Sequence, residues 1–282
     1  MTAFGEIFSY SFVWYAFLGG IFISLCSALL GVNLVLKRLS MLGDGLSHVA
    51  FGAAAVALAV GAAPLKISIP VVVLAAFLLL RVSGSGKMRG DAAIALISSS
   101  ALAIGIIVAT LTTGMNTDIS SYMFGSILAM GREDAVVAVC VSVAILLLYA
   151  LFYHKLFAAT FDEDFSTASG VRVGLCRSLL AVLTAVTVVV GMRMMGALLI
   201  SSIITFPALS AMRICKRYRT VVLTSAALSV LAFLTGLCLS LFFDMPAGAS
   251  IVVVHLLFFT VLSLAAAFRR RIRPQKSAQK EK

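Results

Sequence analysis

The chain has 282 residues, of which 62% are hydrophobic and only 12% are charged, and its mean hydropathy is +1.13. Soluble domains carry about 25% charged residues, so this composition excludes an ordinary water-soluble domain and indicates a polytopic membrane protein. The net charge of +11 is compatible with nucleic-acid binding on its own, so the placement of the basic residues has to decide that question.

Long uncharged runs follow one another along the chain. A run of about 18 or more such residues is long enough to cross the hydrocarbon core as a helix. Seven runs meet this length, at residues 7–36, 45–65, 92–117, 135–153, 194–212, 220–243 and 245–268. Two shorter runs, 67–80 and 178–192, can also cross if their flanking side chains reach the interface. The first run lacks the basic flank of a cleavable signal, so we expect it to remain as a span. The sequence therefore predicts an all-α fold with about eight or nine transmembrane helices.

The basic residues are distributed unequally between the two sides that these spans define. With nine spans and the N-terminus outside, only Lys66, Arg132 and Arg193 of the 22 Lys and Arg residues lie on the outer side. The positive-inside rule then places the N-terminus outside the cytoplasm and the C-terminus within it. Topology accounts for the charge, so nucleic acid is not expected as a partner. We expect one transmembrane domain over 1–268 and a basic cytoplasmic tail over 269–282.

Asp44 and His48 lie at the start of the second long apolar run. A spacing of four residues places both side chains on one helix face, about 6 Å apart along the axis. A carboxylate and an imidazole are suitable ligands for zinc, manganese or iron(II). The alternative is that Asp44 caps the helix while His48 binds a neighbouring carbonyl. Two ligands are too few for a closed divalent site, so a partner segment or a second subunit would have to complete it.

The stretch at 82–91 contains a Gly-Lys pair but no phosphate-binding loop. That motif requires Gly-x-x-x-x-Gly-Lys-Ser/Thr, whereas Arg81 stands at the first Gly position and Met88 at the Ser/Thr position. Any ATP-driven work would therefore need another chain. Further along, the uncharged, mainly apolar stretch of 13 residues at 119–131 has the length of a re-entrant or interfacial helix. The five cysteines are scattered without a C-x-x-C pair, so we expect packed thiols.

Five polar residues in or beside the spans are candidates for a transport pathway. Asp118 and Asp244 lie at extracytoplasmic ends and can attract a cation, although Asp244 also begins a natural turn, "DMPAGAS". The hydroxyls of Ser201 and Ser202 can bond across helices or line a polar path, with ordinary packing as the alternative. His255 lies inside the last span with no acid or cysteine at helical spacing, so it either bonds within the bundle or lines the pathway.

The longest cytoplasmic connection, residues 154–177, holds the only acidic triplet of the chain, in "FDEDFSTASG". By itself this pattern indicates a solvated loop, with a short surface helix that starts near Asp162. His154, at the end of the preceding span, is expected to be an interfacial residue rather than a ligand.

Several stretches resemble one family, the integral-membrane permeases of ATP-binding-cassette importers for zinc, manganese and iron(II). In chain order they are "RLSMLGDGLSHVAFGAA", "TDISSYMFGSIL", "FDEDFSTASGVRVG", "MGALLISSIITFPALSAM" and "DMPAGASIVV". The first and third are specific in combination and the others support them. Together they are spread over nearly the whole chain.

The resemblance implies a compact all-helical permease, like those of type II importers, in the bacterial cytoplasmic membrane. Its partners would be a second permease copy or a close paralogue, two cytoplasmic ATPase subunits and an extracytoplasmic metal-binding protein. It carries the role of metal ligands onto Asp44 and His48. It carries the role of ATPase coupling onto Asp162, Glu163, Asp164, Phe165 and Gly170.

The resemblance also implies that the divalent metal passes through as cargo, with no permanently bound cofactor, no catalytic residue and ATP bound on the partner subunits. Two other transport functions stay open, namely a proton-coupled secondary metal transporter and a permease for a metal chelate. A membrane metalloprotease is disfavoured because the chain lacks the H-E-x-x-H motif.

Overall fold

The protein is described by a computed structural model for residues 11–84, 90–112, 125 and 131–272, and all regular structure within these residues is helical. Nine of the described helices are long and apolar enough to cross a membrane. They are α2 (Ser11–Leu36), α3 (Leu42–Ala59), α4 (Pro64–Gly84), α5 (Gly90–Leu111), α7 (Arg132–Phe161), α9 (Val173–Met195), α10 (Ala197–Ile214), α11 (Tyr218–Phe243) and α12 (Ala247–Ile272). A short helix, α8 (Glu163–Ala168), lies between α7 and α9. The all-α prediction is confirmed, and the two shorter uncharged runs form spans within α4 and α9.

The helices extend over the uncharged runs because backbone N–H and C=O groups in lipid must be satisfied within the segment. α7 has 30 residues, whereas about 20 cross the hydrocarbon core, so its ends extend beyond that core. α9 and α10 are joined by the single residue Gly196, whose φ of 85° and ψ of 159° suit glycine because it has no Cβ. α12 continues to Ile272, across the expected start of the basic tail.

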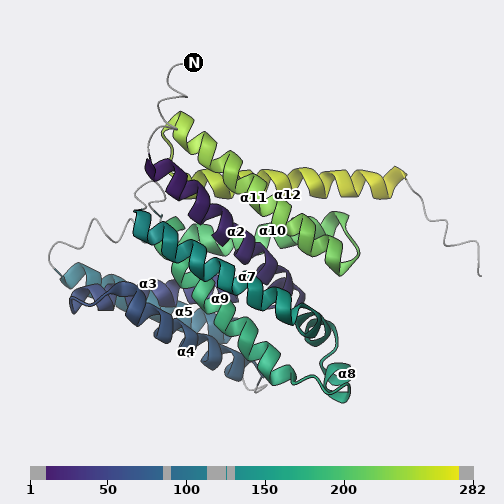
Figure 1. Ribbon diagram of the computed structural model, residues 1–282, viewed down its shortest axis with the longest axis horizontal. Coiled ribbons are helices and arrows are strands. Elements are labelled where there is room, and N and C mark those ends of the chain that lie inside the picture. The colour runs from purple at the N-terminus through teal and green to yellow at the C-terminus, as the bar shows by residue number, and fades with distance from the viewer. Residues whose placement is uncertain (1–10, 85–89, 113–124, 126–130, 273–282) are drawn as a thin grey trace, which may run out of the picture.

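The bundle has four interior helices and five outer ones. More than half of the residues in α2, α3, α9 and α10 are buried, whereas a third or less are buried in the other spans. α3 packs mainly against α4 and α5, and α10 packs against α2, α11 and α12. Figure 1 shows α3, α4 and α5 together on one side, α11 and α12 on the other, and α2, α7 and α9 between them. The outer helices therefore present their apolar side chains to lipid or to another subunit.

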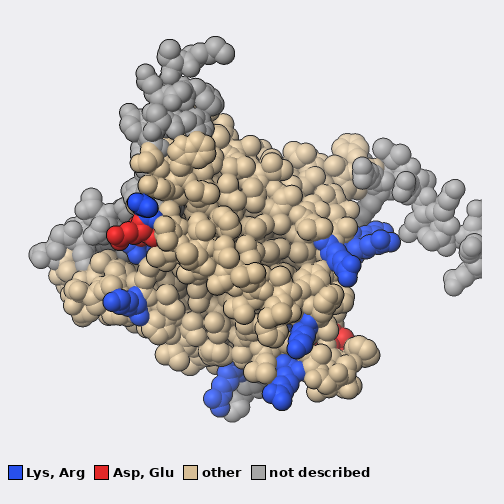
Figure 2. Space-filling view, in the orientation of Figure 1, with Lys and Arg blue, Asp and Glu red and all other residues tan. Residues whose placement is uncertain are grey.

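Charged side chains gather at the two ends of the bundle. The end where α2, α4, α7 and α10 finish is called here the basic end, and Figure 2 shows blue side chains along it at the lower right. Its described basic residues are Lys37, Arg38, Arg81, Lys155, Arg172, Arg177, Arg213, Lys216, Arg217 and Arg219. At the opposite end Arg193 pairs with Asp134 at 2.8 Å. This asymmetry is the one that the orientation prediction requires, and the orientation itself stays a prediction.

Candidate metal site and coupling helix

The position of α3 is fixed by close approaches to its neighbours. A Cβ at Gly52 would collide with the backbone carbonyl of Ala101, so α3 and α5 pack closely at this point. Gly43 faces Ile204, near the middle of α10, and Gly45 faces Ile94 of α5. Successive helical residues turn by about 100°. The residue between the two glycines, Asp44, is therefore directed toward the gap between α10 and α5, at the depth of the middle of α10.

Asp44 and His48 share one face of α3, as their spacing predicts. The distance from His48 Nε2 to Asp44 Oδ2 is 3.7 Å, and the side chains are 20% and 45% exposed respectively. α3 begins at Leu42 and its N-cap position is Met41, so Asp44 lies inside the first turn and does not occupy the cap position. Most residues of α3 around the pair are buried. The two polar side chains therefore lie on a partly exposed face of α3, although α3 has the largest buried share of all the described spans. This face is called here the half-open face of α3.

The pair offers one carboxylate and one imidazole nitrogen to a cation. A separation of 3.7 Å exceeds the normal range of an N–H···O hydrogen bond, so the two groups do not satisfy each other. Within the part of the chain that the structure describes, no group of three or more His, Cys, Asp or Glu side chains could hold a metal ion. Closed divalent sites need about four ligands. Asp44 and His48 alone would therefore supply two of the ligands of such a site.

The hydroxyls proposed for a pathway bond within their own helix. Ser201 Oγ donates to the carbonyl of Leu198 at 3.2 Å, and Ser202 Oγ donates to that of Leu199 at 2.8 Å. Both serines lie within one turn before Ile204, the residue of α10 that faces Gly43. They are close to the depth of Asp44, but no hydrogen bond among the described residues joins them to the pair.

Among the other pathway candidates, the described ones, His255 and Asp244, form no hydrogen bond or ion pair with Asp44 or His48. His255 is buried in α12, where its Nδ1 binds the carbonyl of Ile251 at 2.9 Å and its Nε2 has no hydrogen-bond partner among the described residues. Asp244 is exposed at the end of α11 with a left-handed φ of 52°, which agrees with the turn expected there. Asp118 and most of the stretch at 119–131 lie outside the described residues.

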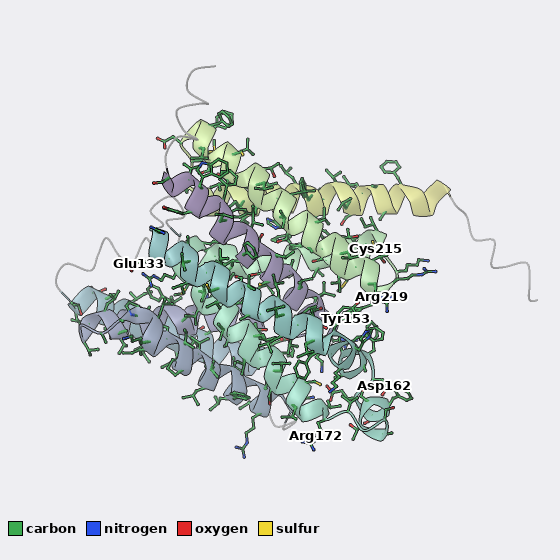
Figure 3. The ribbon with its side chains drawn as sticks, viewed as in Figure 1. Glu133, Tyr153, Asp162, Arg172, Cys215 and Arg219 are labelled. Carbon is green, nitrogen blue, oxygen red and sulfur yellow. The ribbon has the colours of Figure 1, made fainter. Side chains whose placement is uncertain are left out.

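The acidic triplet forms the start of α8, at the basic end (Figures 1 and 3). Asp162 is the N-cap, and its side chain accepts a hydrogen bond from the Phe165 amide at 2.9 Å. This is the capping arrangement that satisfies an otherwise unpaired N–H group. Gly170 ends the segment with a φ of 82°, and the next amide, Val171, donates to the Ser166 carbonyl at 2.9 Å. The short surface helix expected near Asp162 is therefore present.

The side chains of α8 divide into a bound side and an exposed side. Glu163 accepts a bond of 2.8 Å from Lys37 at the end of α2, and two bonds of 2.8 and 3.0 Å from Arg177 in α9. The hydrogen bond from Lys37 is the main cause that lowers the pKa of the Glu163 carboxyl. Asp164 is exposed, and the Phe165 ring is 67% exposed. Glu163 thus attaches α8 to the bundle, while Phe165 faces outward.

Two parts of this region cannot be seen in the sequence pattern. One is the attachment of Glu163 to Lys37, which is 126 residues away in the chain. The other is a buried polar cluster around Asn33 of α2, which donates to the Tyr149 hydroxyl at 2.9 Å and accepts from Tyr218 at 2.9 Å and Thr160 at 3.1 Å. The one signal of this cluster in the sequence is Asn33 itself, because an amide side chain inside an apolar span needs hydrogen-bond partners.

Comparison with known proteins gives one consistent family. The chain matches the ABC 3 transport family over residues 9–266. It is 29% identical to the high-affinity zinc uptake system membrane protein ZnuB of Haemophilus influenzae, over 88% of this chain and 95% of that protein. It is 27% identical to the manganese transport system membrane protein MntC of Halalkalibacterium halodurans, over 92% of this chain and 88% of that protein.

A solved structure agrees with the sequence comparison. A chain of PsaBC from Streptococcus pneumoniae, solved in complex with Fab, superposes with a TM-score of 0.85 at 27% identity. The match covers 95% of this chain and 99% of that one. The fold and the sequence therefore lead to the same family.

Proposed function

Because the chain belongs to the ABC 3 transport family, we propose that it is the membrane permease of an ATP-driven importer for a divalent transition metal, zinc or manganese, with iron(II) also compatible. The single observation that supports this function best is the Asp44–His48 pair on the half-open face of the most buried span. Relatives named for zinc and for manganese uptake support the class of cargo. A bacterial cytoplasmic membrane is the setting that these relatives imply.

In this proposal Asp44 and His48 bind the metal transiently. A carboxylate offsets part of the cost of placing a divalent cation in a low-dielectric bundle. A small ligand set suits transport, because the cation must bind strongly enough to enter and weakly enough to leave. The two remaining ligands would come from a second permease, either another copy or a paralogue, across a two-fold axis.

Energy would come from two cytoplasmic ATPase subunits, and an extracytoplasmic binding protein would deliver the metal. The exposed ring of Phe165 fits a groove on an ATPase partner, while Asp162 and Gly170 define the two ends of α8. Glu163 would transmit movement of α8 to α2 and α9, because its carboxylate binds both. Such movement would rock the spans between outward-open and inward-open states.

The test is metal uptake into proteoliposomes that contain the permease with its ATPase partners. We expect Asp44→Asn and His48→Gln each to lower the initial rate of uptake by at least about 100-fold, because each removes a direct ligand. Glu133→Gln, an exposed carboxylate at the start of α7, is the matched control and should transport normally. Blue-native electrophoresis would verify that all variants assemble.

Two results would contradict the proposal. Undiminished uptake by both single variants would remove the pair from the metal path. Uptake by the permease alone, driven by a proton gradient without an ATPase, would establish the secondary transporter instead.

A further inference from the structure

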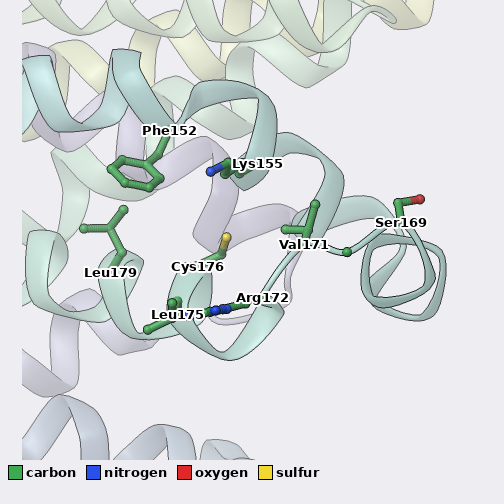
Figure 4. Close-up of a pocket in the computed structure, with 9 residues that line it drawn as sticks. Phe152, Lys155, Ser169, Val171, Arg172, Leu175, Cys176 and Leu179 are labelled. Carbon is green, nitrogen blue, oxygen red and sulfur yellow. The ribbon is translucent and has the colours of Figure 1, made fainter.

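A groove lies between the end of α7 and the start of α9, beside α8. Its volume is about 640 Å³. Phe152 and Lys155 line it from α7, whereas Arg172, Leu175 and Leu179 line it from the segment that opens α9. Figure 4 shows Phe152 and Leu179 at one end of the groove, with Lys155 and Arg172 nearer to α8. One end of the groove is therefore apolar, and two cations lie toward the other end.

The groove lies where the hydrocarbon core of the membrane ends. The uncharged run of α7 covers 135–153, so Lys155 is the first lysine or arginine after it. Arg172, the N-cap of α9, and Arg177 in its first turns precede a stretch without charge from 178 to 192. An apolar end in lipid and a basic end at headgroup level are the features by which clefts between transmembrane helices bind anionic lipids.

The two cations of the groove are not neutralised by the described part of the protein. There Glu163 pairs with Lys37 and Arg177, and Asp134 pairs with Arg193, whereas neither Lys155 nor Arg172 forms an ion pair. Lys155 Nζ lies 5.5 Å from the centre of the Phe152 ring, at the junction of the apolar and basic parts. The start of α9 at Val173 adds the partial positive charge of a helix N-terminus. The basic end of the groove therefore suits a phosphate group, and the apolar end suits an acyl chain of the same molecule.

We propose that this groove binds one anionic phospholipid of the surrounding leaflet. Its phosphate would lie at Lys155 and Arg172, and an acyl chain would lie along Phe152 and Leu179. The groove also includes residues 169–171, which follow α8 directly. A bound lipid would hold the connection from α8 to α9 in place. It would thereby stabilise the contact that α8 is proposed to make with the ATPase subunits.

Native mass spectrometry of the purified full-length permease tests this binding. The protein is titrated with phosphatidylglycerol and, separately, with phosphatidylcholine of the same acyl chains. We expect phosphatidylglycerol to bind the double variant Lys155→Gln/Arg172→Gln about 30-fold more weakly than the wild type, because two cations near the headgroup are lost. The double variant Arg213→Gln/Lys216→Gln removes two charges from the same end outside the groove and should bind like the wild type.

A second variant tests the apolar half independently. Leu175 is 60% exposed, so Leu175→Trp can fill the groove without disturbing the core. It should also weaken phosphatidylglycerol binding, although both cations remain. Equal binding of phosphatidylcholine and phosphatidylglycerol by the wild type would overturn the proposal, as would displacement of the lipid by inorganic phosphate at millimolar concentration. Unchanged lipid binding with reduced ATPase co-purification in Lys155→Gln/Arg172→Gln would assign the groove to the partner protein instead.

Discussion

At the level of single residues, the ligand chemistry of His48 would decide which metals the proposed site favours. Its Nε2 and the Asp44 Oδ2 are 3.7 Å apart, too far to form a hydrogen bond with each other, so both atoms can be offered to a cation. A ring nitrogen favours zinc, whereas carboxylate oxygens favour manganese. The relatives named for zinc and for manganese uptake indicate that this fold serves both cargoes.

We therefore predict that His48→Asp changes selectivity rather than simply abolishing uptake. The ratio of zinc to manganese taken up from an equimolar mixture should fall by about tenfold, because an oxygen ligand replaces a nitrogen ligand. The measurement is the metal content of proteoliposomes that contain the permease and its ATPases. His154→Asp makes the same chemical change at an exposed histidine of α7 and should leave the ratio unchanged. An equal shift in both variants, or none in His48→Asp, would contradict the prediction.

At the level of elements, α8 depends on one carboxylate for its position. The pKa of the Glu163 carboxyl is lowered mainly by the hydrogen bond from Lys37, so its value in the folded protein lies below its ordinary value. A lowered carboxyl pKa contributes stability above the unfolded pKa, and that stability is lost as the pH falls through the folded value. At neutral pH the attachment is therefore fully present. Lys37 is only 11% exposed, so loss of Glu163 would leave a nearly buried cation without this partner.

We predict that Glu163→Gln loosens α8 while Phe165→Ala does not. Loss of a partly exposed ion pair costs about 1 kcal/mol, which corresponds to about fivefold faster hydrogen exchange of the amides in 163–171. Phe165→Ala should leave exchange unchanged and lower ATPase co-purification, because its ring points outward. Asp164→Asn, an exposed neighbour, serves as the exchange control. If Glu163→Gln exchanged at the wild-type rate, Glu163 would not position the helix.

The elements were predictable from the sequence wherever one local property determines them. Uncharged length determined the spans, and the capping carboxylate of Asp162 determined where α8 begins. The same-face arrangement of Asp44 and His48 followed from helical periodicity alone. The contact of Glu163 with Lys37 and the partners of Asn33 could not be predicted, because more than 100 residues separate these groups along the chain. The groove beside α8 could not be predicted for a different reason, since its residues are close in the chain but its shape depends on how α7 packs against α9.

At the level of the whole molecule, the half-open face of α3 is the place where the proposed second permease would dock. In the proposed site one chain would supply two of about four metal ligands, and the described residues hold no group of three or more candidate ligands. Met41 lies three residues before Asp44, hence nearly one turn away on the same side of the chain, and its side chain is 58% exposed. Two copies related by a two-fold axis at this face would bring both pairs together and cover Met41.

This arrangement predicts that Met41→Cys, in a Cys140→Ser background that removes the exposed native thiol, forms a disulfide-linked permease dimer in membranes. Non-reducing electrophoresis after mild oxidation would show the dimer, and reduction would return the monomer. Val136→Cys, equally exposed but on α7, should stay monomeric because α7 does not border the half-open face of α3. Divalent metal added before oxidation should alter the rate of cross-linking only while Asp44 and His48 are present, since these two residues would bind the metal at the proposed interface. A cross-link through Val136→Cys but not through Met41→Cys would place the two-fold axis elsewhere, and the half-site on α3 would then face lipid.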